Sequence, residues 1–466
     1  MEKRGHILLD TYAKHTILGK GSYGYVYGPM FPCGNDPDYD ELEVDEREKI
    51  VKNLVSKLCE LDEGQKEYQL GKLVISEIEI KDPTIIKGDF KSYKYGVYAQ
   101  SHCAMVTKSD SKSSTRFLNA KKGNFELDDL ITNLTRKEKN LDRIREIKNG
   151  TRIAVLQMEK ADGCISSINF EKAEFKNLSL ESRFQWFHGI DNVIIGLLKM
   201  HLKNLHHFDV KPENLVYFGP KTHPTTIKMC DFGLVLRTNQ VNKDNCFAVY
   251  YFHDNWPPLT KLLYDLILLK KRTKNIIKNA IHTWVEGYKV FFREKAKNLI
   301  QRMNFVYKKL LDEEYCLGVV YRFLRKSRAS EIRLKNLLDA ADMYGIALTL
   351  SRMWSFFDDR EKDDQIKFVS FLSKCIEFDF TDQEFYLKFH ELKELFTGGA
   401  LPIPDPERPK NPNPSIWMNK TRTEPAFRTE PVTPLLEEES APEINPPSPI
   451  SRFLATSDVR QFLCGI

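Results

Sequence analysis

Residues 207–214 read HFDVKPEN, and residues 231–233 read DFG. The first segment places an acid, a lysine and an asparagine at fixed offsets, at Asp209, Lys211 and Asn214, and the second segment adds another acid. Such a set supplies a base for a hydroxyl proton, a cation beside a migrating phosphate and oxygen ligands for magnesium. Each fixed position matches by chance about one time in twenty, so the whole set in order is not accidental. The two segments predict phosphoryl-transfer chemistry.

The composition indicates a globular, multidomain chain. Of its 466 residues 41% are hydrophobic, which is enough for a sizeable core. A net charge of +5, from 70 basic and 65 acidic residues, is too mild to demand a nucleic-acid or membrane partner. We find no apolar run that could span a membrane and no signal-type core after residues 1–4. The nine scattered cysteines predict free thiols in a reducing compartment, and we therefore expect an intracellular, cytoplasmic protein.

Changes in pattern along the chain predict two lobes and a tail. Residues 1–162 read as a small, strand-rich lobe with a charged, partly helical insertion at 107–150. Residues 163–398 read as a larger helical lobe with a basic helical insertion at about 260–335. Residues 399–466 are Pro-rich and acidic, and we predict a mostly disordered tail because such a stretch buries too little apolar surface to offset its ordering entropy.

A glycine-rich segment, GKGSYGYV at residues 19–26, matches Gly-x-Gly-x-x-Gly-x-Val. Glycines let a backbone fold tightly over phosphates and point N–H groups at them. Strands are expected on both sides of the segment, which favours a lid over phosphates rather than the strand-to-helix turn of dinucleotide-binding folds. Taken alone, the segment also fits a plain hairpin turn.

Together these motifs resemble the eukaryotic-type protein kinases, over about residues 13–396. The resemblance implies an α+β, bilobal fold with a small antiparallel-sheet lobe, a larger helical lobe and ATP in the cleft. Lys211, two residues after the acid, is similar to the Ser/Thr-type kinases, so the implied reaction is Mg²⁺-dependent transfer of the γ-phosphoryl group of ATP to protein Ser or Thr. The divergent lysine strand, Phe208 and the Trp-Pro-Pro sequence at 256–258 resemble kinases of large DNA viruses such as iridoviruses, which implies a host cytoplasm or virion location.

The resemblance assigns a role to each motif residue. Asp209 would accept the substrate hydroxyl proton, and Lys211 would neutralise charge on the γ-phosphate. Asn214 and Asp231 would hold magnesium. The lid over the nucleotide, with its first and last members against the base, would consist of Leu18, Gly19, Lys20, Gly21, Ser22, Tyr23, Gly24, Tyr25 and Val26.

The strand lysine that holds the α- and β-phosphates in the family is harder to find, because the chain has no Val-Ala-Ile-Lys strand. We choose Lys57 over Lys52, because the residues beside Lys57 alternate better as a strand. Its carboxylate partner should lie on the following helix, where we choose Glu67 over Glu60 and Glu63. For any single lysine, a solvated surface charge is the ordinary alternative.

Residues 153–163, IAVLQMEKADG, resemble the last strand of the small lobe and the hinge. In the family, backbone groups of the hinge bind adenine. Met158 would then lie at the back of the pocket, and the hinge would run from Glu159 to Ala161. An ordinary buried strand is the alternative.

The large lobe departs from the family at three points. Phe208 replaces an Arg that usually pairs with an activation-loop phosphate, which predicts a kinase not switched on by that route. Leu259 stands where a buried Glu is expected, so the packing there must differ. Asp342 resembles the acid that anchors the catalytic loop from the central helix, although the glycine that accompanies it, Gly345, comes early.

Three other functions stay open. A pseudokinase scaffold is favoured only by the uncertain strand lysine, and Lys211 argues against a small-molecule kinase on the same fold. The basic run at 270–274 could bind nucleic acid, but such runs are more often a solvated helix face.

Overall fold

The computed structural model describes residues 16–21, 24–28, 30, 53–79, 83–87, 90–104, 125–148, 152–241, 256–269, 273–295, 304–325, 329–357 and 361–397. All of them belong to one compact unit, Met1–Gly399, whereas the predicted tail lies outside the described residues. Among the helices these residues form, none combines the length and the apolar character that a membrane span requires.

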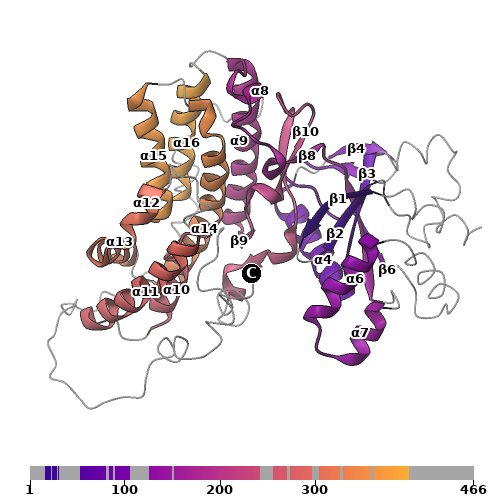
Figure 1. The fold of residues 1–466 in the computed structure, drawn as a ribbon, viewed down its shortest axis with the longest axis horizontal. Helices are drawn as coiled ribbons and strands as arrows, with labels where there is room; N and C mark the ends of the chain where they lie inside the picture. The colour runs from indigo at the N-terminus through magenta and orange to yellow at the C-terminus, as the bar shows by residue number, and fades with distance from the viewer. Residues whose placement is uncertain are drawn as a thin grey trace, which may run out of the picture. The chain divides into compact units, whose positions relative to one another are not determined.

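A five-stranded antiparallel sheet in the order β1-β2-β3-β7-β6 forms the small lobe (Figure 1). Side chains alternate along a strand, so Leu58 of β3 packs under helices α6 and α7 while Val55 and Cys59 pack toward α4. Lys57 shares the face of Val55 and Cys59, which directs it toward α4. The elements are β1 (Thr16–Gly21), β2 (Gly24–Gly28), β3 (Leu54–Glu60), α4 (Leu61–Ile78), β4 (Thr84–Lys87), β5 (Phe90–Ser92), β6 (Ser101–Ala104), α6 (Phe125–Lys137), α7 (Leu141–Lys148) and β7 (Ile153–Glu159).

Helix α4 begins directly after β3 because Glu60 caps it. The Glu60 carboxylate accepts hydrogen bonds from the amides of Asp62 and Glu63, which would otherwise lack partners in the first turn. The helix lies very close to the sheet at Gly64, where an added Cβ would come within 2.6 Å of the Ala154 Cβ. This close approach brings the inner face of α4 over β3.

The larger lobe is built around α9, whose apolar stripe includes the fully buried Ile190, Val193 and Leu197. Helix α9 contacts α14 and α16 along its length, and α10 packs on α14 (Figure 1). The elements are β8 (Gly163–Cys164), η1 (Ile165–Ser167), α8 (Ala173–Lys176), α9 (Leu180–Leu202), β9 (Leu205–His206), η2 (Pro212–Asn214), β10 (Leu215–Phe218), β11 (Thr226–Met229), η3 (Phe232–Leu234), β12 (Leu236–Arg237), η4 (Thr238–Gln240), α10 (Thr260–Leu268), α11 (Lys274–Lys295), α12 (Asn304–Lys309), α13 (Glu313–Arg325), α14 (Ser330–Arg352), η5 (Trp354–Phe357), α15 (Lys362–Ile376) and α16 (Asp382–Thr397).

The predicted α+β class, with a small antiparallel-sheet lobe and a larger helical lobe, is confirmed. Residues 93–100 separate the short strands β5 and β6, and α14, the helix that carries Asp342, begins at Ser330. The basic run falls between α10, which ends at Leu268, and α11, which begins at Lys274, and its residues 270–272 lie outside the described residues.

The cysteines also differ from expectation at one position. Cys103 is disulfide-bonded, so the prediction of free thiols throughout was wrong. Its partner is not among the described cysteines, because the others there are free: Cys59, Cys164, Cys230, Cys316 and Cys375.

Candidate active site

Three charged side chains from separate elements meet at Lys57. Its Nζ lies 2.7 Å from Glu67 Oε2 and 2.9 Å from Asp231 Oδ1. The lysine comes from β3, Glu67 from the inner face of α4 and Asp231 from the residue before η3. The side chains of Lys57 and Glu67 are 9% and 11% exposed, so the pair is shielded from solvent. We call these three residues the lysine cluster.

Burial and neighbouring charges act against each other in the lysine cluster. Burial opposes the charge of Lys57, but the two carboxylates outweigh it and raise the pKa of the ammonium well above its usual value. Burial would also raise the pKa of Asp231, but Lys57 lowers it, so Asp231 stays ionised. Burial raises the pKa of Glu67 in spite of Lys57. Asp231 is therefore the more firmly ionised of the two acids.

The catalytic loop forms its own hydrogen-bonded set. Asp209 Oδ2 accepts from Lys211 Nζ at 2.7 Å and from Asn214 Nδ2 at 2.8 Å. Asn214 Nδ2 also donates to the Asp209 carbonyl at 2.9 Å. Asp209 and Asn214 are 4% and 6% exposed, so the set is preorganised inside the protein. Because Asn214 donates both hydrogen bonds through Nδ2, its Oδ1 is the atom that could bind a metal.

Helix α14 anchors the backbone of this loop. Asp342 accepts hydrogen bonds from the amides of His207 and Phe208, both at 2.8 Å. One turn later the helix lies against the loop at Gly345, where an added Cβ would come within 2.1 Å of the Val210 carbonyl oxygen. The anchoring expected of Asp342 is present, and the early glycine has a physical reason, since only a residue without Cβ fits against Val210.

The position normally held by Arg is buried and apolar. Phe208 is 3% exposed and adopts φ +66, a strained value for a bulky residue. Its ring meets those of His206 and Trp256 edge to face, and its carbonyl accepts from Trp256 Nε1 at 2.8 Å. The residue at the expected Arg position is thus an aromatic ring that packs against the indole of Trp256. Leu259, which replaces the expected Glu, is fully buried.

The predicted lid is partly described. The hairpin of β1 and β2 pairs Gly21 with Gly24, and Ser22 and Tyr23 between them lie outside the described residues. Gly24 is required by close packing, because an added Cβ would come within 2.5 Å of the Leu58 carbonyl. Leu18 is 52% exposed.

The other lid residues lie in the same hairpin. Val26 packs on the apolar cluster that contains Met158. Lys20 Nζ lies 3.3 Å from an Asp129 carboxylate and 5.3 Å from the centre of the Tyr25 ring. Gly19 pairs with Val26 across the hairpin.

At the predicted hinge, the side chain of Glu159 bonds to other side chains of the protein. Its carboxylate lies 2.8 Å from Lys228 Nζ and accepts from Ser92 Oγ at 2.8 Å. The amides of Lys160 and Asp162 are bonded to other backbone carbonyls, whereas the Ala161 amide has no partner among the described residues. Of the residues predicted to form the hinge, Ala161 therefore has the backbone amide best able to donate to a ligand.

The donor set fits magnesium, which prefers oxygen ligands. Lys57 takes Asp231 Oδ1 and leaves Oδ2, while Asn214 keeps its Oδ1. The ion pairs around this donor set join three acidic side chains, Asp209, Asp231 and Glu67, to two lysines, Lys57 and Lys211. The roles of these residues in binding ATP and Mg²⁺ stay predictions.

The rival residues in the small lobe are placed elsewhere. Lys52 lies outside the described residues. Glu60 caps α4 and pairs with Arg152 at 2.6 Å, so it does not face Lys57. Glu63 lies in the exposed first turn of α4.

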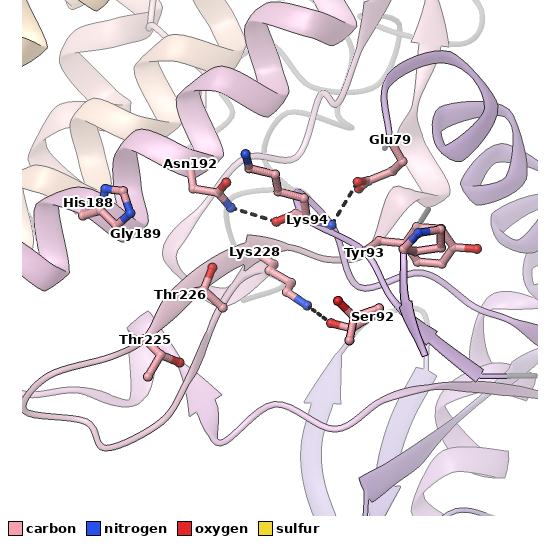
Figure 2. Close-up of a pocket in the computed structure, with 12 residues that line it drawn as sticks. Glu79, Ser92, Tyr93, Lys94, His188, Gly189, Asn192, Thr225, Thr226 and Lys228 are labelled. Atoms are coloured by element: carbon pink, nitrogen blue, oxygen red, sulfur yellow. Dashed lines mark hydrogen bonds between the residues drawn. The ribbon is translucent and has the colours of Figure 1, made fainter. Parts of the chain in front are cut away.

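A separate cavity of about 390 Å³ lies beside α9 (Figure 2). Asn192 of α9 donates to the Lys94 carbonyl at 2.8 Å, and Lys228 of β11 donates to Ser92 Oγ at 2.7 Å at its edge. None of the predicted site residues lines it. The cavity is therefore distinct from the candidate active site.

Comparison with known proteins adds little. No family model matches the chain, and no curated protein matches it. Among solved structures, the crystal structure of BubR1 kinase domain is similar with a TM-score of 0.29 and 14% identity, over 54% of this chain and 58% of that one. The match therefore spans less than two thirds of that domain, and a likeness this weak carries no argument about activity.

Proposed function

We propose that this chain is a magnesium- and ATP-dependent protein kinase that transfers the γ-phosphoryl group to Ser and Thr hydroxyls of protein substrates. The observation that carries the proposal is the lysine cluster. Glu67 and Asp231 lie 10 and 174 residues from Lys57 in sequence, yet both carboxylates bond its ammonium. A turn or cap would explain a single acid, but it does not explain two acids converging on one buried lysine.

Asp209 is the base of the proposed reaction. Its buried carboxylate, oriented by Asn214, accepts the proton of the attacking hydroxyl. Lys211 lies 2.7 Å from that carboxylate and neutralises charge that gathers on the transferred phosphoryl group. Asn214 and Asp231 would hold Mg²⁺, which when bound neutralises phosphate oxygens.

The small lobe supplies the nucleotide contacts. Lys57 holds the α- and β-phosphates, residues 18–26 cover them, and the hinge from Glu159 to Ala161 contacts adenine. In this division residues 1–162 form the small lobe and 163–398 the large lobe. The presence of Lys211 supports a Ser/Thr acceptor over Tyr or a small molecule, and the likeness of the motifs to kinases of large DNA viruses suggests a viral enzyme.

The acceptor can be tested directly with γ-labelled ATP. We expect label on Ser and Thr, by phosphoamino-acid analysis of a mixed peptide library, and none after Mg²⁺ is removed with EDTA. Nucleotide binding without any transfer would contradict the proposal in favour of a scaffold. Label on lipid or sugar acceptors alone would favour a small-molecule kinase.

A further inference from the structure

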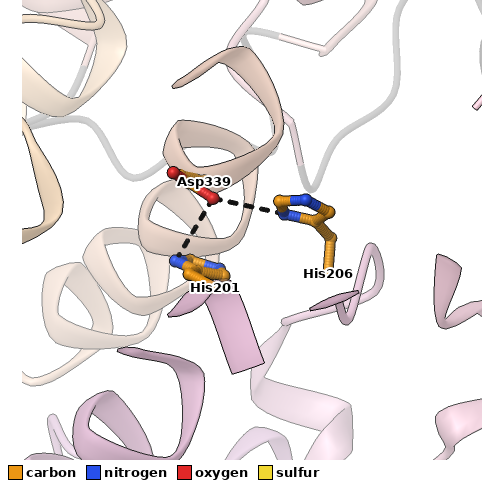
Figure 3. Close-up of side chains that lie close together, drawn as sticks. All are labelled: His201, His206 and Asp339. Carbon is orange, nitrogen blue, oxygen red and sulfur yellow. Dashed lines mark ion pairs between the residues drawn. The ribbon is translucent and has the colours of Figure 1, made fainter. Parts of the chain in front are cut away.

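A second buried charged cluster lies behind the catalytic loop. His201 near the end of α9, His206 in β9 and Asp339 in α14 bring their polar atoms together (Figure 3). Their exposed fractions are 1%, 0% and 8%. We call these three residues the histidine cluster. None of them belongs to the proposed nucleotide site.

The spacing of the polar atoms suits a tetrahedral ion. Asp339 Oδ1 lies 3.3 Å from His206 Nδ1 and 3.6 Å from His201 Nδ1. Zinc binds nitrogen and oxygen at about 2.0–2.2 Å, which sets its tetrahedral ligand atoms about 3.3–3.6 Å apart. The two observed distances fall in this range.

Two of these atoms lack hydrogen bonds. Among the described residues, His206 Nδ1 and Asp339 Oδ1 have no hydrogen-bond partner although both are buried. Buried polar atoms in native proteins are nearly always satisfied, by protein, water or an ion. One cation between them would satisfy both.

The outer nitrogens of the two rings are already occupied. His201 Nε2 lies 3.1 Å from Asp342 Oδ2, and His206 Nε2 lies 2.8 Å from Thr238 Oγ1. Metal-binding histidines typically donate their second ring N–H to such an oxygen, which fixes the tautomer. With Nε2 as the donor, Nδ1 of His206 turns a lone pair toward Asp339, whereas Nδ1 of His201 lies between the Asp339 and Asp382 carboxylates.

A second carboxylate lies beside the histidine cluster. Asp382, the first residue of α16, places Oδ2 2.9 Å from His201 Nδ1. We propose that His201, His206 and Asp339 form a zinc site, with the Asp382 carboxylate bonded to His201 beside it. Two imidazole nitrogens favour Zn²⁺ over Mg²⁺ or Ca²⁺, which prefer oxygen ligands only.

This ion would join three elements, α9, β9 and α14. It would also brace the catalytic loop indirectly. His201 bonds Asp342, and the same Asp342 oxygen accepts the amide of His207. The zinc site does not depend on the proposed kinase activity, because it is defined by metal binding alone.

The test is the zinc content of the purified full chain, measured by mass spectrometry after dialysis without chelator. We expect about one equivalent of zinc in wild type and background levels in His206→Ala and Asp339→Asn. The matched control is His282→Ala, which alters the exposed group of His282, Glu286 and Glu313 and should leave the zinc content unchanged.

A second measurement on wild type avoids variants that fail to fold. Zn²⁺, but not Mg²⁺, should raise the Tm of chelator-treated protein, since a ligand that binds only the folded state stabilises it. Co²⁺ in place of zinc should give the visible absorption of four-coordinate cobalt. A protonated His201 held between Asp342 and Asp382 without any ion predicts no zinc and no Tm rise. That result, or zinc retained in both variants, would overturn the proposal.

Discussion

The catalytic loop and the lysine cluster both belong to the proposed active site, yet they are held in different ways. The loop is fixed through its backbone, by Asp342 at two amides, by Trp256 at a carbonyl and by contact with Gly345. The lysine cluster is joined by two ion pairs between side chains of three elements, centred on Lys57. The loop is thus preorganised by packing, whereas the cluster is a balance of charges.

The largest expected effect comes from breaking the charge balance. Lys57→Met removes the cation and leaves two carboxylates facing each other in a shielded site. We expect phosphoryl transfer at saturating Mg-ATP to fall by about 10²–10³-fold, the size typical for loss of one preorganised electrostatic group. Initial rates with a Ser/Thr peptide measure it.

A matched control for this change is Lys172→Met, on an exposed residue of the large lobe. Its rate should stay close to wild type. If Lys57→Met also kept the wild-type rate while both proteins stayed folded by circular dichroism, the lysine cluster would not be part of the active site.

The next effect tests the backbone anchoring. Gly345→Ala forces a Cβ to within 2.1 Å of the Val210 carbonyl, so helix and loop must separate. We expect a loss of about 1–3 kcal/mol in the free energy of unfolding, as for other overpacked sites, together with reduced activity. Urea unfolding measures the loss.

Gly318→Ala is the control, because an added Cβ there meets nothing closer than 3.9 Å and the residue lies within α13. In that open helical position, alanine should stabilise by up to about 1 kcal/mol. Equal effects of the two substitutions would show that α14 does not press on the catalytic loop as described.

The smallest effect concerns the hydrogen bond from Trp256 to the loop at Phe208. Trp256→Phe keeps an aromatic ring but removes the donor to the Phe208 carbonyl. We expect the free energy of unfolding to fall by about 1 kcal/mol, the net value of one hydrogen bond. In contrast, Trp186→Phe removes an indole N–H without a hydrogen-bond partner among the described residues, so it should cost less. A larger loss of stability for Trp186→Phe than for Trp256→Phe would show that the Trp256 hydrogen bond does not hold the loop as described.

Local sequence predicted the site residues that follow one another in the chain. Asp209, Lys211 and Asn214 lie on one short loop, so their spacing fixes their proximity. The strand alternation that led to the choice of Lys57 matches β3, where alternate side chains face α4 and Lys57 pairs with Glu67; its role in nucleotide binding stays a prediction. Glu67 could be chosen as the partner from sequence alone, because it lies on the helix that follows this strand.

Long-range contacts could not be read in the same way. The histidine cluster joins His201 and His206 to Asp339, which lies more than a hundred residues later, so no spacing motif in the sequence predicts it. The one signal was His201 on an otherwise apolar helix face. The contact between Trp256 and Phe208 could not be predicted either, because neither sequence segment indicates the other as its partner.

The most direct test of the central claim is Mg-ATP turnover by wild type beside Asp209→Asn, with Asp363→Asn on an exposed turn of α15 as control. Loss of the base should lower the rate by about 10²–10⁴-fold while ATP binding persists. Asp363→Asn should match wild type. Equal turnover by wild type and Asp209→Asn would show that the activity does not arise at this site, and the proposed function would then be wrong.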